Sequence, residues 1–239
     1  MIYFMLGAIV GSFMLCLTFE SSSLLRKSHC DYCKHILSWR DLIPILSFIF
    51  MGGRCRYCNT KLSSKYLISE VTTGAAIFLI SFNQVLDITV LSAIAVILIP
   101  LAIYDTQYLM IPNFMLILLL QILSTIYFID SFNNFAFDFT IIFNKIMIFI
   151  LLHLFFFLTK SIGYGDIKLL SILLLFLPIP FFITLFFVTY LIGGIACIIF
   201  LSYKTALKRM PLVPFITSAY FVVIVLYDEI NKIYFGGFI

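Results

Sequence analysis

The sequence predicts an all-α polytopic membrane protein with about eight transmembrane helices. Its 239 residues are 63% hydrophobic and only 11% charged, and the mean hydropathy is +1.17. A soluble domain is about half apolar and about a quarter charged. Apolar stretches that approach the roughly twenty residues needed to cross a bilayer recur along the whole chain. This composition excludes an ordinary soluble globular domain.

The expected spans are separated by turn residues and prolines. The first span has no basic residue before it and no small-residue cleavage site after it, so we expect a retained helix. Pro178 and Pro180 divide a long apolar run, because proline lacks the amide donor and clashes with the preceding turn. The eight expected spans are residues 1–19, 66–82, 90–104, 112–129, 141–159, 167–177, 181–202 and 214–227.

The basic residues predict the orientation of these spans. Eight of the 15 lysines and arginines lie in the segment 20–65, namely Arg26, Lys27, Lys34, Arg40, Arg54, Arg56, Lys61 and Lys65. Because positive loops stay in the cytoplasm, we expect this segment inside and the N-terminus outside. About 13 of the 15 basic residues then face the cytoplasm. We expect a multi-pass protein of the plasma (inner) membrane, surrounded by lipid and without a nucleic-acid partner; the sequence sets no oligomeric state.

Two C-x2-C pairs lie within the cytoplasmic segment. Cys30 and Cys33 form the first pair, and Cys55 and Cys58 form the second, about twenty residues later. This double spacing is typical of four-thiolate zinc sites, and the cytoplasm disfavours disulfides. Four protein ligands leave no open position, so the zinc would be structural. The alternative is a redox dithiol pair, as in a membrane thiol oxidoreductase.

A mostly apolar stretch, 42–50, lies between the two cysteine pairs. Nine residues are too few to span a bilayer, so we expect this stretch to lie on or dip into the inner membrane surface. The predicted organisation is therefore a first transmembrane helix over 1–19, a cytoplasmic four-cysteine loop over 20–65, and a transmembrane core over 66–239. The predicted fold class is therefore an all-α membrane protein with a small cytoplasmic zinc-binding loop.

Two carboxylates lie at the ends of expected spans. Asp105 follows the span 90–104, and Asp166 precedes the span 167–177. An ionisable group at membrane depth is costly, so each is a functional candidate by default. The eight-span topology puts both residues on the cytoplasmic side and at one depth, as a catalytic pair requires.

Such a pair can hydrolyse a peptide bond. Like charges a few ångströms apart cannot both ionise, so one carboxyl keeps a proton for the scissile carbonyl while the other activates water. Gly163 and Gly165 precede Asp166 and permit close approach of a substrate backbone. We predict a membrane aspartyl protease with Asp105 and Asp166 as catalytic residues and the two glycines as backbone support.

The sequence also allows other interpretations of these polar residues. Asp166 could be an ordinary helix N-cap, and Asp105 could mark a helix end at the headgroups. Glu70 is expected to pair with Lys168 or Lys65, or to face the interface; Glu70 and Lys168 are the candidates for supporting the site. A proton- or cation-coupled transporter could use both aspartates, although a transport site is expected near the midplane.

Six short motifs occur in an order that resembles one known family. They are Gly11-Ser12-Phe13, the two cysteine pairs with Ile43-Pro44-Ile45-Leu46-Ser47 between them, Ser64-Lys65-Tyr66 with Glu70 and Gly74, Asp105 with Ile111-Pro112-Asn113, Gly163-Tyr164-Gly165-Asp166-Ile167-Lys168-Leu169, and Pro211 through Pro214-Phe215. The chain resembles the type IV prepilin peptidases, membrane aspartyl proteases of the GxGD class, and most closely the competence-type members.

The resemblance implies a substrate and a reaction. Such enzymes cut the basic leader from a prepilin or pseudopilin precursor at the cytoplasmic face, after a glycine and before an apolar helix. Many also N-methylate the new terminus with S-adenosylmethionine. Residues 14–17 depart from the family, which usually has an asparagine and then an arginine there, so methylation is left open. A GxGD protease that cuts signal peptides is the rival within the class, and the cysteine loop argues against it.

Overall fold

The computed structural model describes residues 1–19, 28–30, 32–83, 86–131, 138–160, 162–202 and 210–234. Within these ranges the chain is helical, and the only β pairing is two isolated bridges in the cysteine loop. The helices are α1 (Ile2–Phe19), η1 (Trp39–Leu42), α2 (Leu46–Phe50), α3 (Ser64–Ile80), α4 (Ile88–Tyr108), α5 (Asn113–Ser131), α6 (Phe139–Thr159), α7 (Tyr164–Phe176), α8 (Ile179–Ser202) and α9 (Val213–Tyr234).

The eight long helices, α1 and α3 to α9, coincide with the eight expected spans. Five of them, α1, α4, α5, α6 and α8, are long and apolar enough to cross a membrane. The helix α3 has 17 residues and α7 has 13, so these two are shorter than a full crossing. The predicted all-α membrane architecture is confirmed. Five of the basic residues used for the orientation, Arg26, Lys27, Lys204, Lys208 and Arg209, lie outside the described residues.

Two of the helix boundaries that differ from the expectation affect an aspartate. The helix α4 continues past residue 104 to Tyr108, so Asp105 lies in its last turn. It ends at Leu109, which has a left-handed backbone and donates its amide to the Asp105 carbonyl at 2.9 Å. The helix α7 begins at Tyr164 instead of residue 167, with Gly163 as its N-cap. The expected break near Pro178 is confirmed, because α7 ends at Phe176.

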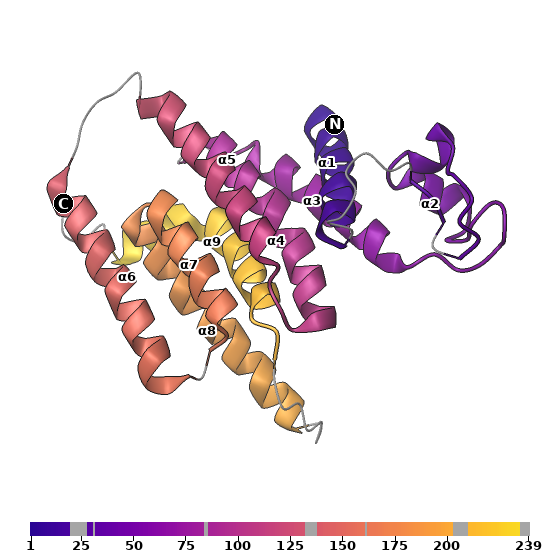
Figure 1. Ribbon diagram of the computed structural model, residues 1–239. Helices are drawn as coiled ribbons and strands as arrows, with labels where there is room; N and C mark the ends of the chain where they lie inside the picture. The colour runs from indigo at the N-terminus through magenta and orange to yellow at the C-terminus, as the bar shows by residue number, and fades with distance from the viewer. Residues whose placement is uncertain are drawn as a thin grey trace.

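The helix α4 is the centre of the bundle. It packs against α1, α3, α5 and α9. Half of the residues in the most apolar segment of α4 are buried, whereas only 6% are buried in the corresponding segment of α6. The helix α6 runs along the outer edge of the molecule (Figure 1). Because burial on several faces fixes a helix, α4 positions whatever its ends carry.

Small residues bring α1 and α3 into close contact. A Cβ atom on Gly7 would lie 2.8 Å from the Thr73 carbonyl oxygen, and one on Gly74 would lie 2.9 Å from the Phe4 carbonyl oxygen. Gly7 and Gly11 follow the small-x3-small spacing that lets membrane helices approach closely. The cysteine loop is therefore carried by two helices that are packed tightly together.

Candidate active site and metal centre

Asp105 is buried where α4 meets α9. Its side chain is 5% exposed, and its Oδ2 accepts a hydrogen bond from the Val213 amide at 3.1 Å. Val213 is the first residue of α9, so its amide has no partner inside that helix. A carboxylate at this position satisfies an orphan donor and lies at the positive end of the α9 dipole. This contact between residues 108 positions apart holds the Asp105 carboxylate in one orientation.

Asp166 lies in the first turn of α7 and is half-buried. Gly163, not Asp166, is the N-cap, so the ordinary N-cap reading of Asp166 is wrong. A Cβ atom on Gly163 would lie 2.8 Å from Asp166 Oδ2, and one on Gly165 would lie 3.2 Å from Ile111 Cβ. Neither glycine has a positive φ. Both are needed for close approach, and Gly163 leaves room for the Asp166 carboxylate itself.

The loop between α4 and α5 connects the two aspartates. Asp105 precedes this loop, Ile111 packs against Gly165, and Asn113 Oδ1 accepts a hydrogen bond from Lys168 Nζ at 3.0 Å. The C-terminal end of α4 and the N-terminal ends of α7 and α9 lie at the same end of the bundle (Figure 1). The charges of Asp105 and Asp166 are close enough to interact. The structure thus places at the same end of the bundle the two carboxylates that the sequence singled out.

Sequence reasoning missed a tyrosine near this pair. The Tyr190 hydroxyl, on α8, is buried and has no hydrogen-bond partner among the described residues. It lies near Asp166, on the helix that follows α7. A tyrosine in the middle of an apolar span gives no sequence signal of this proximity, because it depends on how α8 packs.

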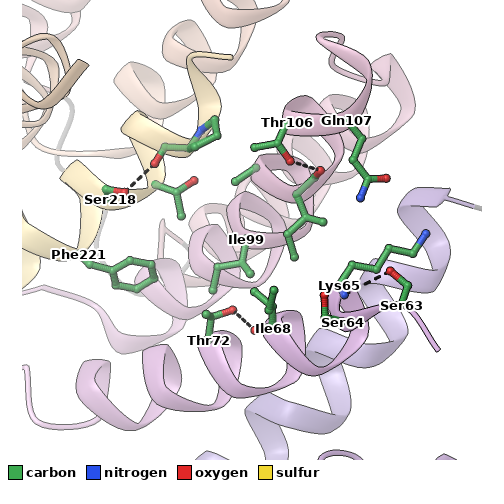
Figure 2. A pocket seen from close by; sticks show the side chains of 14 residues that line it. Ser63, Ser64, Lys65, Ile68, Thr72, Ile99, Thr106, Gln107, Ser218 and Phe221 are labelled. Atoms are coloured by element: carbon green, nitrogen blue, oxygen red, sulfur yellow. Dashed lines mark hydrogen bonds between the residues drawn. The ribbon is translucent and has the colours of Figure 1, made fainter. Parts of the chain in front are cut away.

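A cavity of about 510 Å³ lies between α3, α4 and α9 (Figure 2). Its lining includes Thr106, the residue after Asp105, and Pro214, the residue after Val213. Ile68, Ile99 and Phe221 supply apolar surface, and the Thr72, Thr106 and Ser218 hydroxyls donate to carbonyls of their own helices. The cavity therefore presents a largely apolar wall near the chain segments that carry Asp105 and Val213.

Glu70 does not form the expected ion pair. It is buried at 8% exposure, and its Oε1 accepts a hydrogen bond from Ser12 Oγ at 2.7 Å. Its Oε2 accepts one from the Ile45 amide at 2.6 Å. Lys168 donates to Asn113, and the Lys65 ammonium lies 3.8 Å from the centre of the Phe19 ring. The interpretation of Glu70 as a lysine partner or an interface residue is therefore wrong: it joins α1, α3 and the cysteine loop.

The four loop cysteines form one cluster that could hold a metal ion. Cys30, Cys33, Cys55 and Cys58 have their sulfur atoms within 4.8 Å of one another. The two knuckles have the same backbone: the residue after each second cysteine, Lys34 or Asn59, has φ 57° and donates its amide to the carbonyl of the first cysteine at 2.9 Å. Two matched turns that each present two sulfurs can supply the four ligands of a tetrahedral metal site.

The surroundings of the sulfurs fit a cation. Hydrogen bonds with the Thr60 hydroxyl and amide lower the pKa of Cys58 to about 6. A backbone hydrogen bond at Cys33 is the largest effect on Cys30, whose pKa is also lowered. A backbone hydrogen bond at His35 lowers the pKa of Cys33, but burial and the three neighbouring sulfurs have the larger, opposite effect. Together they raise this pKa to about 11. Four crowded sulfurs can all be thiolates only if a positive ion lies between them.

A buried carboxylate ties this centre together. Burial raises the pKa of Asp41, but hydrogen bonds from the Ser38 hydroxyl and amide and the Arg56 charge outweigh it and keep that pKa below its usual value. The Tyr57 hydroxyl also donates to Asp41, at 3.2 Å, and the Tyr57 ring lies 3.7 Å from the His35 ring. Asp41 therefore links η1 to the second cysteine knuckle.

The chain matches two family models in succession. Residues 5–84 match the bacterial peptidase A24 N-terminal domain, and residues 92–199 match the type IV leader peptidase family. The chain belongs to the type IV leader peptidase family. The first match covers the cysteine loop and the second covers both aspartates, so the two parts of the family pattern occur in one chain. The family resemblance expected from the motifs is confirmed.

Several curated proteins support this membership. The prepilin leader peptidase/N-methyltransferase of Bacillus subtilis (strain 168) is 28% identical over 218 residues, which cover 88% of this chain and 87% of that protein. The protein of the same name from Myxococcus xanthus (strain DK1622) is 31% identical over 115 residues, or 46% of this chain and 34% of its own length. A Klebsiella pneumoniae protein of that name is 33% identical over 88 residues, covering 36% of this chain and 39% of that protein. No solved structure matches the chain.

Membership in this family of peptidases leaves the transporter alternative without support. The geometry argues in the same direction, because Asp105 and Asp166 lie in the last turn of α4 and the first turn of α7. A transport site is expected near the middle of its helices. The catalytic roles of the two aspartates and the identity of the metal stay predictions.

Proposed function

We propose that this protein is a membrane aspartyl endopeptidase that removes the leader peptide from a type IV prepilin or pseudopilin precursor. The observation that carries the proposal is the placement of Asp105 and Asp166 in the terminal turns of α4 and α7 at one end of the bundle, in a chain of the type IV leader peptidase family. The relatives are named for prepilin cleavage, and this chain aligns with most of the Bacillus subtilis protein.

The reaction follows from two carboxylates that share one proton. The ionised member accepts a proton from a water molecule, and the resulting hydroxide attacks the scissile carbonyl carbon. The protonated member donates its proton to the carbonyl oxygen, which gives a neutral tetrahedral intermediate. Collapse of this intermediate breaks the C–N bond, and the leaving nitrogen takes a proton from the pair. Because the pair titrates as a unit, neither aspartate is assigned as the base.

The two aspartates would contribute differently to this geometry. The Val213 amide holds Asp105 at 3.1 Å, so one carboxylate has a fixed orientation before substrate arrives. Asp166 is less buried than Asp105 and lies beside Gly163 and Gly165, which carry no side chains. A substrate backbone that approaches along these glycines would meet Asp166 first.

The orientation and the metal are parts of the same proposal. The positive-inside rule favours a cytoplasmic cysteine loop and a cytoplasmic catalytic face in the plasma membrane. The four cysteine sulfurs favour zinc, which prefers tetrahedral thiolate sites and would stabilise the loop without taking part in hydrolysis. N-methylation with S-adenosylmethionine is the second reaction to measure, because the names of the relatives include it.

The test is cleavage of a prepilin or pseudopilin precursor in membranes that contain the wild type, Asp105→Asn or Asp166→Asn. Asparagine keeps the size of the side chain but cannot share the proton, so each variant should lose at least about 100-fold in rate. Asp138→Asn is the matched control, because Asp138 caps the N-terminus of α6, far along that helix from the end that leads into α7. Asparagine caps a helix as well as aspartate does, so the control should cleave normally.

Two results would contradict the proposal. Cleavage by either active-site variant at the control rate would remove the aspartyl mechanism. Wild-type membranes that cleave no prepilin, while the Bacillus subtilis relative cleaves the same precursor, would remove the proposed substrate class. Metal analysis of each purified variant ensures that lost activity does not come from a lost cysteine centre.

A further inference from the structure

Five of the exposed large apolar side chains of the cysteine loop lie on its two short helices, although the loop belongs to no span. We call them the apolar edge: Trp39 is 71% exposed, Leu42 47%, Leu46 45%, Ile49 61% and Phe50 84%. They come from η1 and α2, which pack against each other. An exposed group of this kind marks a site that meets a partner or a membrane.

The Glu70 hydrogen bonds show how deep this part of the loop lies. Glu70 accepts from the Ile45 amide and from Ser12, so these three residues share one level. Ser12 is seven residues before the end of α1, and Glu70 is six residues after the start of α3. At 1.5 Å per residue, Ile45 lies about 9–10.5 Å along the helices from the ends that carry the loop. The start of α2 is therefore level with the body of a helix long enough to cross a membrane.

A strained turn at Ile45 holds the start of α2 at this position. Ile45 has φ 65° and ψ −54°, and the Leu46 amide donates to the Pro44 carbonyl at 2.6 Å around it. A β-branched residue rarely adopts a positive φ, and such strain persists only where the surroundings enforce it. The 2.6 Å bond from the Ile45 amide to Glu70 provides that constraint. The position of α2 relative to α1 and α3 is thus specified by a buried contact.

The charge beside the apolar edge is positive. Residues 32–63 contain five basic side chains and a single acid, Asp41, which is buried and faces Arg56. The Arg40 guanidinium lies 5.3 Å from the centre of the Trp39 ring. Tryptophan is enriched at the headgroup level of bilayers, and basic residues near an anionic lipid surface are attracted to it. Apolar insertion and positive charge together fit an anionic lipid surface.

We infer that the apolar edge inserts into the membrane leaflet on the loop side, with Arg40 at the level of anionic lipid headgroups. The lipid anchor and the Glu70 contact would hold the metal centre against the membrane from two sides. The depth of about 9–10.5 Å agrees with that of interfacial helices, whose apolar faces lie about 5–10 Å into the headgroup and acyl boundary. This inference does not depend on the reaction that the protein catalyses.

The chain provides its own probe, because Trp39 is its single tryptophan. The full-length protein is placed in nanodiscs of phosphatidylcholine, alone or mixed equally with phosphatidylglycerol. We expect Trp39 emission at shorter wavelength than in the denatured chain, strong quenching by lipids brominated near the top of the acyl chain, and weak quenching by aqueous acrylamide. Emission like that of the denatured chain, with acrylamide quenching and no bromolipid quenching, would overturn the inference.

Matched variants separate insertion from general effects on the fold. Phe50→Ser should reduce bromolipid quenching of Trp39, because it removes the most exposed member of the apolar edge. Phe82→Ser removes a phenylalanine that is 68% exposed just beyond the opposite end of α3, and it should leave the quenching unchanged. Phosphatidylglycerol should increase the bromolipid quenching of Trp39 in the wild type, and Arg40→Gln should abolish this increase. Equal quenching in all variants and both lipid mixtures would reject the lipid contact.

Discussion

Gly163→Ala tests whether the glycine before α7 exists to make room for the Asp166 carboxylate. The backbone at Gly163 has φ −64° and ψ 138°, which alanine adopts without strain. The obstacle is local, because the new methyl carbon would lie 2.8 Å from Asp166 Oδ2. Ordinary contact begins at 3.4 Å, so the carboxylate must move by about 0.6 Å or change rotamer.

The expected magnitude follows from this displacement. A misplacement of about 1 Å in a catalytic group can cost about 100-fold in rate, so a shift of about 0.6 Å should slow cleavage by roughly 10- to 100-fold. The fold should be affected little, since alanine in place of glycine at an N-cap loses only a modest part of the cap energy, about 1 kcal/mol or less. The variant should therefore express, insert and retain its metal while it cleaves slowly.

The assay is the first-order rate of prepilin cleavage in membranes with equal amounts of enzyme. Gly194→Ala is the control, because a Cβ atom on Gly194 in α8 meets nothing within 4 Å. This control should cleave at the wild-type rate and show the same thermal stability. Wild-type cleavage by Gly163→Ala would refute the reasoning, since the carboxylate could then move without consequence. Equal losses in both variants would mean that added methyl groups act on the bundle in general.

Three further outcomes are expected. Cys58→Ser, or a strong chelator, should release the bound metal and make the cysteine loop sensitive to protease while the helix content is retained; an unchanged digestion pattern would contradict a structural metal. Glu70→Ala should cost about 1–3 kcal/mol, because the Ile45 amide and the Ser12 hydroxyl both lose their acceptor; denaturation that coincides with the wild type would contradict this. Tyr190→Phe should leave the thermal midpoint unchanged or raise it, whereas Tyr220→Phe should lower it. The reason is that, within the described part of the chain, only the Tyr220 hydroxyl has a hydrogen-bond partner, the Leu91 carbonyl at 2.8 Å. A lower midpoint for Tyr190→Phe than for Tyr220→Phe would contradict these contacts.

Much of the fold could be predicted because its signals are local. Apolar length locates the spans, and proline ends one span and begins another near Pro178. The two C-x2-C pairs predict their own meeting, since each turn presents two sulfurs and a metal needs four. The aspartates were found because a charge beside an apolar run is costly. Each of these arguments needs only neighbouring residues.

What could not be predicted depends on contacts between distant residues. The partners of Glu70 are 58 and 25 residues away, and the nearby lysine that the sequence favours binds elsewhere. The end of α4 was placed too early at residue 104, because hydropathy reports where the membrane ends and not where the helix ends. The Val213 amide carries no side-chain signal at all, although it fixes the orientation of Asp105.

The two aspartates are held by different kinds of structure, and this decides where the geometry of the pair can vary. Asp105 ends the most buried helix of the bundle and is bonded to the start of α9. Asp166 begins α7, a helix of 13 residues that is joined to the α4–α5 loop by the Gly165–Ile111 contact and the Lys168–Asn113 hydrogen bond. A change in the core would have to disturb many packed side chains to move Asp105, whereas a small change near α7 is enough to move Asp166. The separation of the carboxylates, and with it their ability to share a proton, is therefore set mainly on the α7 side.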